Sequence, residues 1–244
     1  MFKSFVLALA LGMLSSISLA QSIAGIHIGD PSSVLDKLNL KPTARDRIGS
    51  MDTVKYKLDN GNELSVTHES LAGRIVYLEC DWNRNAESVA TDFPGFKFGV
   101  TTLEEIRIAN GSNGFSYKSH AMNTAAGELY TFNSYNIKDK PGLIAVFVTA
   151  LNIAESRKRR NNREPGGEDI AKNLTLDAVI LAEETYLDGI WGKEKIYGKE
   201  SKPISWPAID TTAENLGSNP SLNPIPITEE ERAFSGPVSR RRRA

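Results

Sequence analysis

One local pattern occurs twice in the chain and constrains its fold more than any other feature. Ile26-His27-Ile28-Gly29 precedes a segment of helical spacing and then residues that alternate between apolar and polar side chains. Phe96-Lys97-Phe98-Gly99 begins the same order again, at an offset of 70 residues. Helix-period and strand-period segments in a repeated order indicate an internal duplication of one supersecondary unit. We therefore predict an α+β protein with two repeated helix–β-meander modules, residues 21–92 and 93–154, which form one twisted antiparallel sheet.

The first module should begin with a short helix over residues 31–40. Asp30 is a suitable N-cap, and Pro31 fits the first helical position. Pro42 limits the helix at its other end, because a residue before proline disfavours the helical conformation. The apolar residues at helical spacing in this segment are Val34, Leu35 and Leu38.

Two strands follow, and their register depends on the loop that joins them. A two-residue loop at Asn60-Gly61 would pair Tyr56 with Ser65 and split the apolar face. A three-residue loop over 59–61 pairs Tyr56 with Leu64, and it puts Gly61 at the position that requires positive φ. We predict the three-residue loop, followed by a third strand over 74–82.

The second module repeats this order. Thr101 or Thr102 can cap a helix that ends at Asn110-Gly111, whose residues tolerate the left-handed conformation. A turn over 138–142 separates the last two strands. The predicted strands of this module are 115–122, 128–137 and 143–151.

The rest of the chain changes character. We predict a solvated basic loop over residues 155–173, which contain Pro165-Gly166-Gly167. The region 174–200 should hold a C-terminal helix that docks on the sheet through an apolar stripe. The stripe, which only Glu183 interrupts, is formed by Leu176, Val179, Ile180, Leu187, Ile190 and Trp191. Six of the eleven prolines lie in 201–244, so we predict a disordered tail ending in four arginines, with Trp206 as its anchor.

The first twenty residues have the pattern of a secretory signal peptide. Lys3 precedes the apolar run 5–13, and Ser18 and Ala20 place small residues at the cleavage site before Gln21. The apolar run is shorter than a membrane span. We therefore expect a soluble periplasmic or secreted protein with no transmembrane segment after cleavage.

Composition excludes several classes of function. Basic and acidic residues number 29 and 30, which argues against nucleic acid as a partner. One cysteine and three histidines without metal-ligand spacing predict no metal site and no cofactor. Cys80, with His68 as base, is the one candidate for thiol chemistry. A small buried side chain is the favoured interpretation of Cys80, because it falls on the apolar face of its strand.

Two basic clusters can contact an anionic partner, such as lipid headgroups, surface polysaccharide or an acidic protein. Alternatively, both clusters are simply solvated, and the one at the end of the tail is a processing site. The first cluster is Arg157, Lys158, Arg159 and Arg160; the second is Arg240, Arg241, Arg242 and Arg243.

The repeated order over about residues 25–151 resembles the tandem modules of β-lactamase-inhibitor-type proteins. It is also similar to the single module of the small lipoprotein subunit of the outer-membrane β-barrel assembly machinery. This resemblance implies concave antiparallel sheets that bind other proteins and carry out no chemistry. The chain departs from both families, since it has no lipobox cysteine and Cys80 has no second cysteine to pair with.

These observations favour an exported, non-enzymatic protein-interaction module whose partner is another exported or envelope protein. Its candidate contact residues are aromatic, because aromatic side chains dominate interface hot spots. The alternatives are a periplasmic hydrolase or thiol enzyme that uses Cys80 and His68, and an envelope-surface binder that uses the arginine tail. The candidate contact residues are Tyr56, Tyr77, Tyr130, Phe132, Tyr135 and Trp206.

Overall fold

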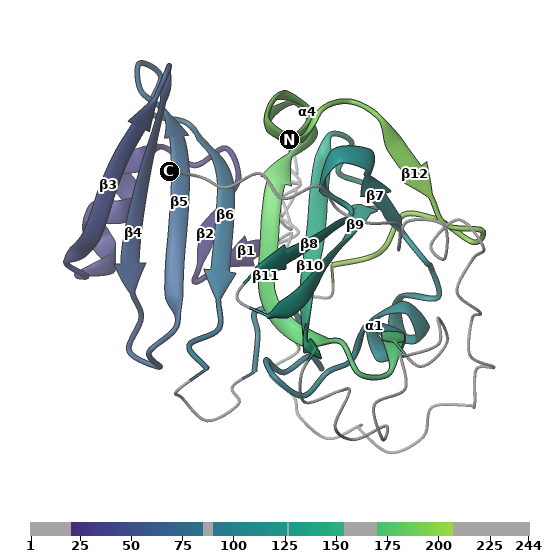
Figure 1. The fold of residues 1–244 in the computed structure, drawn as a ribbon. Helices are drawn as coiled ribbons and strands as arrows, with labels where there is room; N and C mark the ends of the chain where they lie inside the picture. The colour runs from purple at the N-terminus through teal and green to yellow at the C-terminus, as the bar shows by residue number, and fades with distance from the viewer. Residues whose placement is uncertain (1–20, 85–89, 126, 154–169, 207–244) are drawn as a thin grey trace, which may run out of the picture.

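The computed structural model describes residues 21–84, 90–125, 127–153 and 170–206 (Figure 1). The predicted signal peptide, nearly all of the basic loop and the tail after Trp206 lie outside these residues. The strands are β1 (Ser22–Ile23), β2 (Ile26–His27), β3 (Pro42–Ile48), β4 (Met51–Lys57), β5 (Glu63–Glu69), β6 (Ile75–Asp81), β7 (Phe115–Tyr117), β8 (Met122–Ala125), β9 (Glu128–Asn136), β10 (Leu143–Asn152), β11 (Thr175–Glu183) and β12 (Lys195–Tyr197). The helices are the 3₁₀ segments η1 (Ser32–Leu38) and η2 (Lys118–His120) and the α-helices α1 (Leu103–Asn110) and α4 (Glu184–Trp191).

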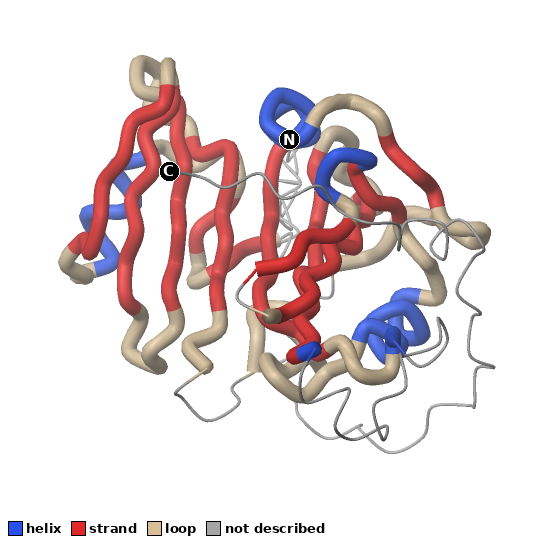
Figure 2. Tube along the Cα trace, viewed as in Figure 1, coloured by secondary structure: helices blue, strands red, loops and turns tan. Residues whose placement is uncertain are grey.

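Antiparallel pairing dominates the fold, as predicted. Ten strands form one sheet in the order β12-β7-β9-β10-β11-β6-β5-β4-β3, with β8 paired to β9 beside this path. Strands β1 and β2 form a separate small sheet. The strands run as one array through the molecule (Figure 2). Its centre is the β6–β11 pair, in which Cys80 lies opposite Val179 and Leu78 opposite Leu181.

The predicted register of the first hairpin is confirmed. Tyr56 lies opposite Leu64 and Val54 opposite Val66, so the apolar residues of both strands share one face. Gly61 has a φ of 86°, in the left-handed region that glycine tolerates. The three-residue loop therefore sets which side chains of β4 and β5 enter the core.

Strand β3 was not predicted from the sequence. It forms the edge of the sheet beside β4, and all of its residues after Pro42 are exposed. An edge strand exposed on both faces needs no apolar alternation, and charged residues such as Arg45 and Arg47 discourage further strand pairing. The periodic signal of a strand is absent here for that reason.

The two predicted helices near the repeated pattern both form, but with different ends. Helix α1 begins at a capping box, in which Thr102 and Glu105 satisfy each other's backbone N–H groups, and Gly111 ends it in the left-handed conformation. Segment η1 is a 3₁₀ helix that follows Pro31 without a side-chain cap. The prediction of Asp30 as its cap is wrong, because the Asp30 carboxylate accepts from the His27 backbone N–H at 2.9 Å.

The predicted C-terminal helix is wrong over its first half. Residues Thr175–Glu183 form strand β11, and only Glu184–Trp191 form helix α4. A central strand that is buried on both faces reads as a continuous apolar run, which periodicity alone does not distinguish from a helix. Glu183, which interrupts the apolar stripe, forms an ion pair with Arg74.

The second meander agrees with the prediction at β9 and β10, while its first strand is divided. The expected strand 115–122 consists of β7, then η2, and β8 begins at Met122. Strand β9 pairs with both β7 and β8. The break therefore lets one stretch of chain pair twice with the same strand.

Two apolar clusters lie on opposite faces of the sheet. One contains Leu64, Val66, Leu78 and Cys80 together with residues of β1, β2 and η1, and it reaches Trp206. The other contains Ile144, Val146, Ala178 and Ile180 and packs against Leu187 of α4. Side chains alternate between faces along a strand. The second face of β4–β6 therefore carries Lys55, Ser65 and Glu79, which are polar.

Candidate functional site: a carboxylate-rich sheet face

The second face of β5, β6, β9 and β11 carries five carboxylates, which we call the carboxylate face. Glu63 of β5 lies opposite Asp81 of β6, and Ser65 lies opposite Glu79. Lys55 of β4 lies opposite Ser65. The members of the face are Glu63, Glu79, Asp81, Glu128 and Asp177, with Lys55 and Arg84 as its cations.

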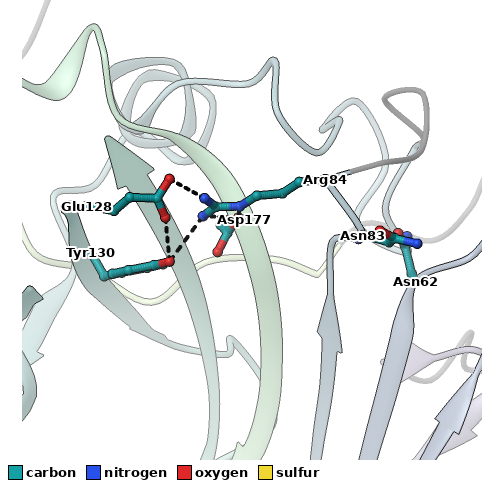
Figure 3. A network of polar contacts seen from close by, with 6 residues as sticks. All are labelled: Asn62, Asn83, Arg84, Glu128, Tyr130 and Asp177. Atoms are coloured by element: carbon teal, nitrogen blue, oxygen red, sulfur yellow. Dashed lines mark hydrogen bonds and ion pairs between the residues drawn. The ribbon is translucent and has the colours of Figure 1, made fainter. Parts of the chain in front are cut away.

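Arg84 is held between two of these carboxylates and a tyrosine (Figure 3). Its Nε donates to Asp177 Oδ1 at 2.9 Å, and the other guanidinium nitrogens contact Glu128 and the Tyr130 hydroxyl. Tyr130 donates to Glu128 Oε2 at 2.6 Å, and its ring centroid lies 5.7 Å from Arg84 Cζ. The three groups form a clamp that satisfies the planar guanidinium from several sides.

A β-bulge places Asp177 in this clamp. Ala178 lies opposite Val148 and Leu176 opposite Thr149, so Asp177 is the extra residue of its strand. A bulge re-aims a side chain that regular alternation would place elsewhere. The backbone carbonyl of Asp177 accepts from the Trp82 N–H at 2.8 Å, which fixes the segment that leads to Arg84. Asn62, which is fully buried, accepts from the Asn83 N–H at 3.0 Å in the same segment.

Glu79 and Asp81 lie beside the clamp and lack a comparable cation. Tyr77 donates to Glu79 Oε2 at 2.9 Å, while Lys55 is held by Glu63 at 2.6 Å. Within the part of the chain that the structure describes, neither Glu79 nor Asp81 forms an ion pair with a lysine or arginine. Burial, with repulsion from Glu79 second, raises the pKa of Asp81 to about 8. Burial also raises the pKa of Glu79.

Aromatic rings border the carboxylate face. The Tyr77 ring lies 5.5 Å from Tyr186 of α4, and Phe132 lies 5.8 Å from Trp191. His120 stacks on Trp191 at 4.4 Å, and burial lowers the pKa of His120. These side chains are half-buried. The structure thus brings Tyr77, Tyr130 and Phe132 of the predicted contact residues onto one face.

The other three predicted contact residues lie in the core. Tyr56 and Tyr135 are 3% and 0% exposed and point to the opposite face of the sheet. Trp206 packs edge-on against Phe93, with ring centroids 5.2 Å apart, as the predicted anchor of the chain beyond the sheet. Tyr56 is in the core because the hairpin register puts it opposite Leu64. These three rings present no contact surface in this structure.

The structure does not bring Cys80 and His68 together. Cys80 is 4% exposed, and burial raises the pKa of its thiol to about 12, which disfavours the thiolate. His68 pairs with Ile75 across a bulge, so it lies five residues from Cys80 along β6, roughly 16 Å by strand rise. Its Nδ1 contacts the carbonyl oxygen of Glu69 at 3.2 Å. The pair has no geometry for nucleophilic catalysis.

Two further observations concern metals and membranes. Among the described residues, no three His, Cys, Asp or Glu side chains are placed to hold a metal ion together. No helix in the described ranges has the length and hydropathy to cross a membrane. The basic residues Arg157–Arg160 and Arg240–Arg243 lie outside the described residues.

Sequence reasoning missed the carboxylates of this face. The hairpin register alone placed Glu63 and Ser65 away from the core, and the third strand placed Glu79 and Asp81 likewise. The alternation of side chains between the two faces of each strand could therefore have predicted that these four residues lie close together. The position of Asp177 could not have been predicted in this way, because its segment was expected to be helical.

Comparison with known proteins assigns no family. No family model matches the chain, and no curated protein matches it. One solved structure is similar, a 1.5 Å crystal structure of an extracellular protein containing an SCP domain from Bacillus anthracis str. Ames. The TM-score is 0.39 and the identity 11%, over 72% of this chain and 50% of that chain. The chain thus spans about half of that protein's length, and no function is transferred at this similarity.

Proposed function

We propose that this chain is an exported, non-enzymatic protein-binding module that contacts a polypeptide partner through the carboxylate face and its aromatic border. The observation that carries the proposal is the grouping of Tyr77, Tyr130 and Phe132 with charged groups on one sheet face. Tyrosine is among the residue types that are enriched at interface hot spots. Export rests on the signal-peptide pattern of residues 1–20, and the partner would be another exported or envelope protein.

The proposal includes two helix–meander modules that meet at the β6–β11 pair. Strands β3 to β6 on one side and β7 to β11 on the other each follow a short helix, and the order is mirrored about the centre. Gly29 and Gly99, which end the two repeated motifs, both have positive φ. In this view the second module extends to Glu183, beyond the boundary at 154 that the sequence indicated.

Site-specific photocrosslinking tests the binding face. A photoreactive phenylalanine analogue would replace Lys55 on the polar side of β4, and, as a control, Lys37 of η1. Lys37 is exposed on the element that covers the opposite face. We expect one discrete crosslinked partner from position 55 in producing cells and none from position 37. Equal products from both positions, or none from position 55, would contradict a binding role for this face.

A further inference from the structure

The clamp around Arg84 shows how this face binds a guanidinium. Two carboxylates from different strands and one tyrosine supply the acceptors and the ring, and Arg84 itself comes from the chain directly after β6. Arginine has five N–H donors in a fixed plane, which suits acceptors spread over neighbouring strands.

The same three groups occur again on the adjacent part of the face. Glu79 and Asp81 provide two carboxylates, and Tyr77 lies beside them with its hydroxyl on Glu79. Glu63, directly opposite Asp81, is already bound to Lys55. This second set therefore resembles the Arg84 clamp, except that no described arginine or lysine side chain is paired with its two carboxylates.

An unpaired hydroxyl lies within the second set. Ser65 is 3% exposed and lies opposite Glu79, and its Oγ has no hydrogen-bond partner. A buried polar atom without a partner costs free energy unless a ligand or water satisfies it. An oxygen among carboxylates accepts readily from an N–H donor.

We propose that Glu79, Asp81 and Ser65 bind the guanidinium of an arginine side chain carried by the partner polypeptide. The inference rests on the proposed function, and it names the chemistry by which the partner is recognised. Lysine fits less well, because its compact ammonium has three donors and no plane to lie beside Tyr77. Outside the cluster, Arg84 already neutralises Asp177 and Glu128.

Binding should strengthen as pH rises. The charged groups that face Asp81 are Glu79 on its own strand, Glu63 and Lys55 on the two strands beyond, and Asp177 on β11. Burial raises the pKa of Asp81 to about 8, so much of its charge appears only above neutral pH. A guanidinium stays charged throughout this range. We expect the affinity to increase about tenfold or more between pH 6 and pH 9.

Calorimetric titration with a tetra-arginine peptide, acetylated and amidated at its ends, tests the site directly when it is done at pH 9, where Asp81 is ionised. The full protein would be compared with Asp81→Asn, Glu79→Gln and the control Glu194→Gln, whose exposed carboxylate pairs with Lys118 outside the carboxylate face. Loss of one charged acceptor should weaken binding about tenfold or more in the first two variants. The control should remain within about twofold of wild type, and tetra-lysine should bind more weakly than tetra-arginine.

Three results would overturn the proposal. Equal binding by Asp81→Asn and wild type would show that the cluster is not the site. Affinity independent of pH would exclude an ionising acceptor. A variant with Arg240–Arg243 changed to alanine that binds the peptide at least tenfold more tightly would assign the site to the chain's own tail. If the peptide does not bind but position 55 still gives a crosslinked partner, the arginine site is refuted and the proposed binding function stands. If neither experiment gives binding, the proposed function is refuted as well.

Discussion

At the scale of single residues, the two half-buried carboxyls of β6 on the carboxylate face, Glu79 and Asp81, work against folding in their charged form. Asp81 is half-buried beside Glu79 and opposite Glu63, and desolvation is the largest cause of its raised pKa. A protein retains such groups against their cost to stability where a function uses them. The alternation of side chains along β6 places these two residues on the polar face, which the sequence could predict. The degree of burial that raises the pKa of Asp81 depends on the curvature of the whole sheet and on the elements packed over it.

The free energy of unfolding should fall as pH rises from about 4 to about 8. In this window the unfolded chain has released the Asp81 proton, whereas the folded chain retains it, so deprotonation costs stability. Asp81→Asn removes this cost and should stabilise the protein at pH 8.5 by about 1–3 kcal/mol, with little effect at pH 4. Urea denaturation at both pH values measures the difference. A destabilised variant at pH 8.5 would contradict the assigned environment of Asp81.

The clamp residue Arg84 should contribute to stability through the carboxylates that it neutralises. Arg84→Ala leaves Asp177 and Glu128 near each other without their cation, and we expect a loss of about 1–2 kcal/mol. Arg84→Lys should recover only part of this loss, because an ammonium does not reproduce the planar contacts. Thermal denaturation of both variants at pH 7 provides the measurement. Equal stability of Arg84→Ala and wild type would mean that the clamp is energetically neutral.

At the scale of elements, local signals predicted those parts of the fold that have local causes. The threonine cap of α1 and the Gly61 loop depend on side chains within a few residues, and the sequence predicted both, with Thr101 left open as an alternative cap to Thr102. Strands β3 and β11 depend on their place in the sheet, one at the edge and one at the centre. Neither strand shows an alternation of apolar and polar residues, because the edge strand is exposed on both faces and the central strand is buried on both. Asp177 was missed with β11.

The glycines that end the repeated motifs should differ in their tolerance of alanine. A Cβ at Gly99 would overlap the Trp82 ring, whereas a Cβ at Gly29 has no neighbour within 4 Å. Both have positive φ, so both substitutions carry a conformational cost of about 1 kcal/mol. Gly99→Ala should cost at least about 1–2 kcal/mol more than Gly29→Ala, since the half-buried Trp82 ring must move. Chemical denaturation of the two variants compares them, and equal losses would contradict the close approach of Trp82.

At the scale of the whole molecule, the central β6–β11 pair joins the two meanders into one sheet and brings the carboxylate face together. Asp81 comes from one side of this pair, and Asp177 and Glu128 from the other. The face therefore depends on assembly of both halves. The recurring sequence pattern predicted two meanders in one sheet, but it did not predict β11, the strand that pairs with β6 at the centre of the sheet.

Nuclear magnetic resonance mapping of the tetra-arginine peptide on the isotope-labelled protein tests the central claim most directly. Binding at the carboxylate face predicts the largest amide shift changes at Glu63–Ser65 and Tyr77–Asp81, with small changes in η1 on the opposite face. The same titration of Asp81→Asn, with both proteins at pH 8.5, should give much smaller shifts at equal peptide concentration, because Asp81 is then largely ionised. Shift changes concentrated in η1, or a map unchanged by Asp81→Asn, would contradict the account.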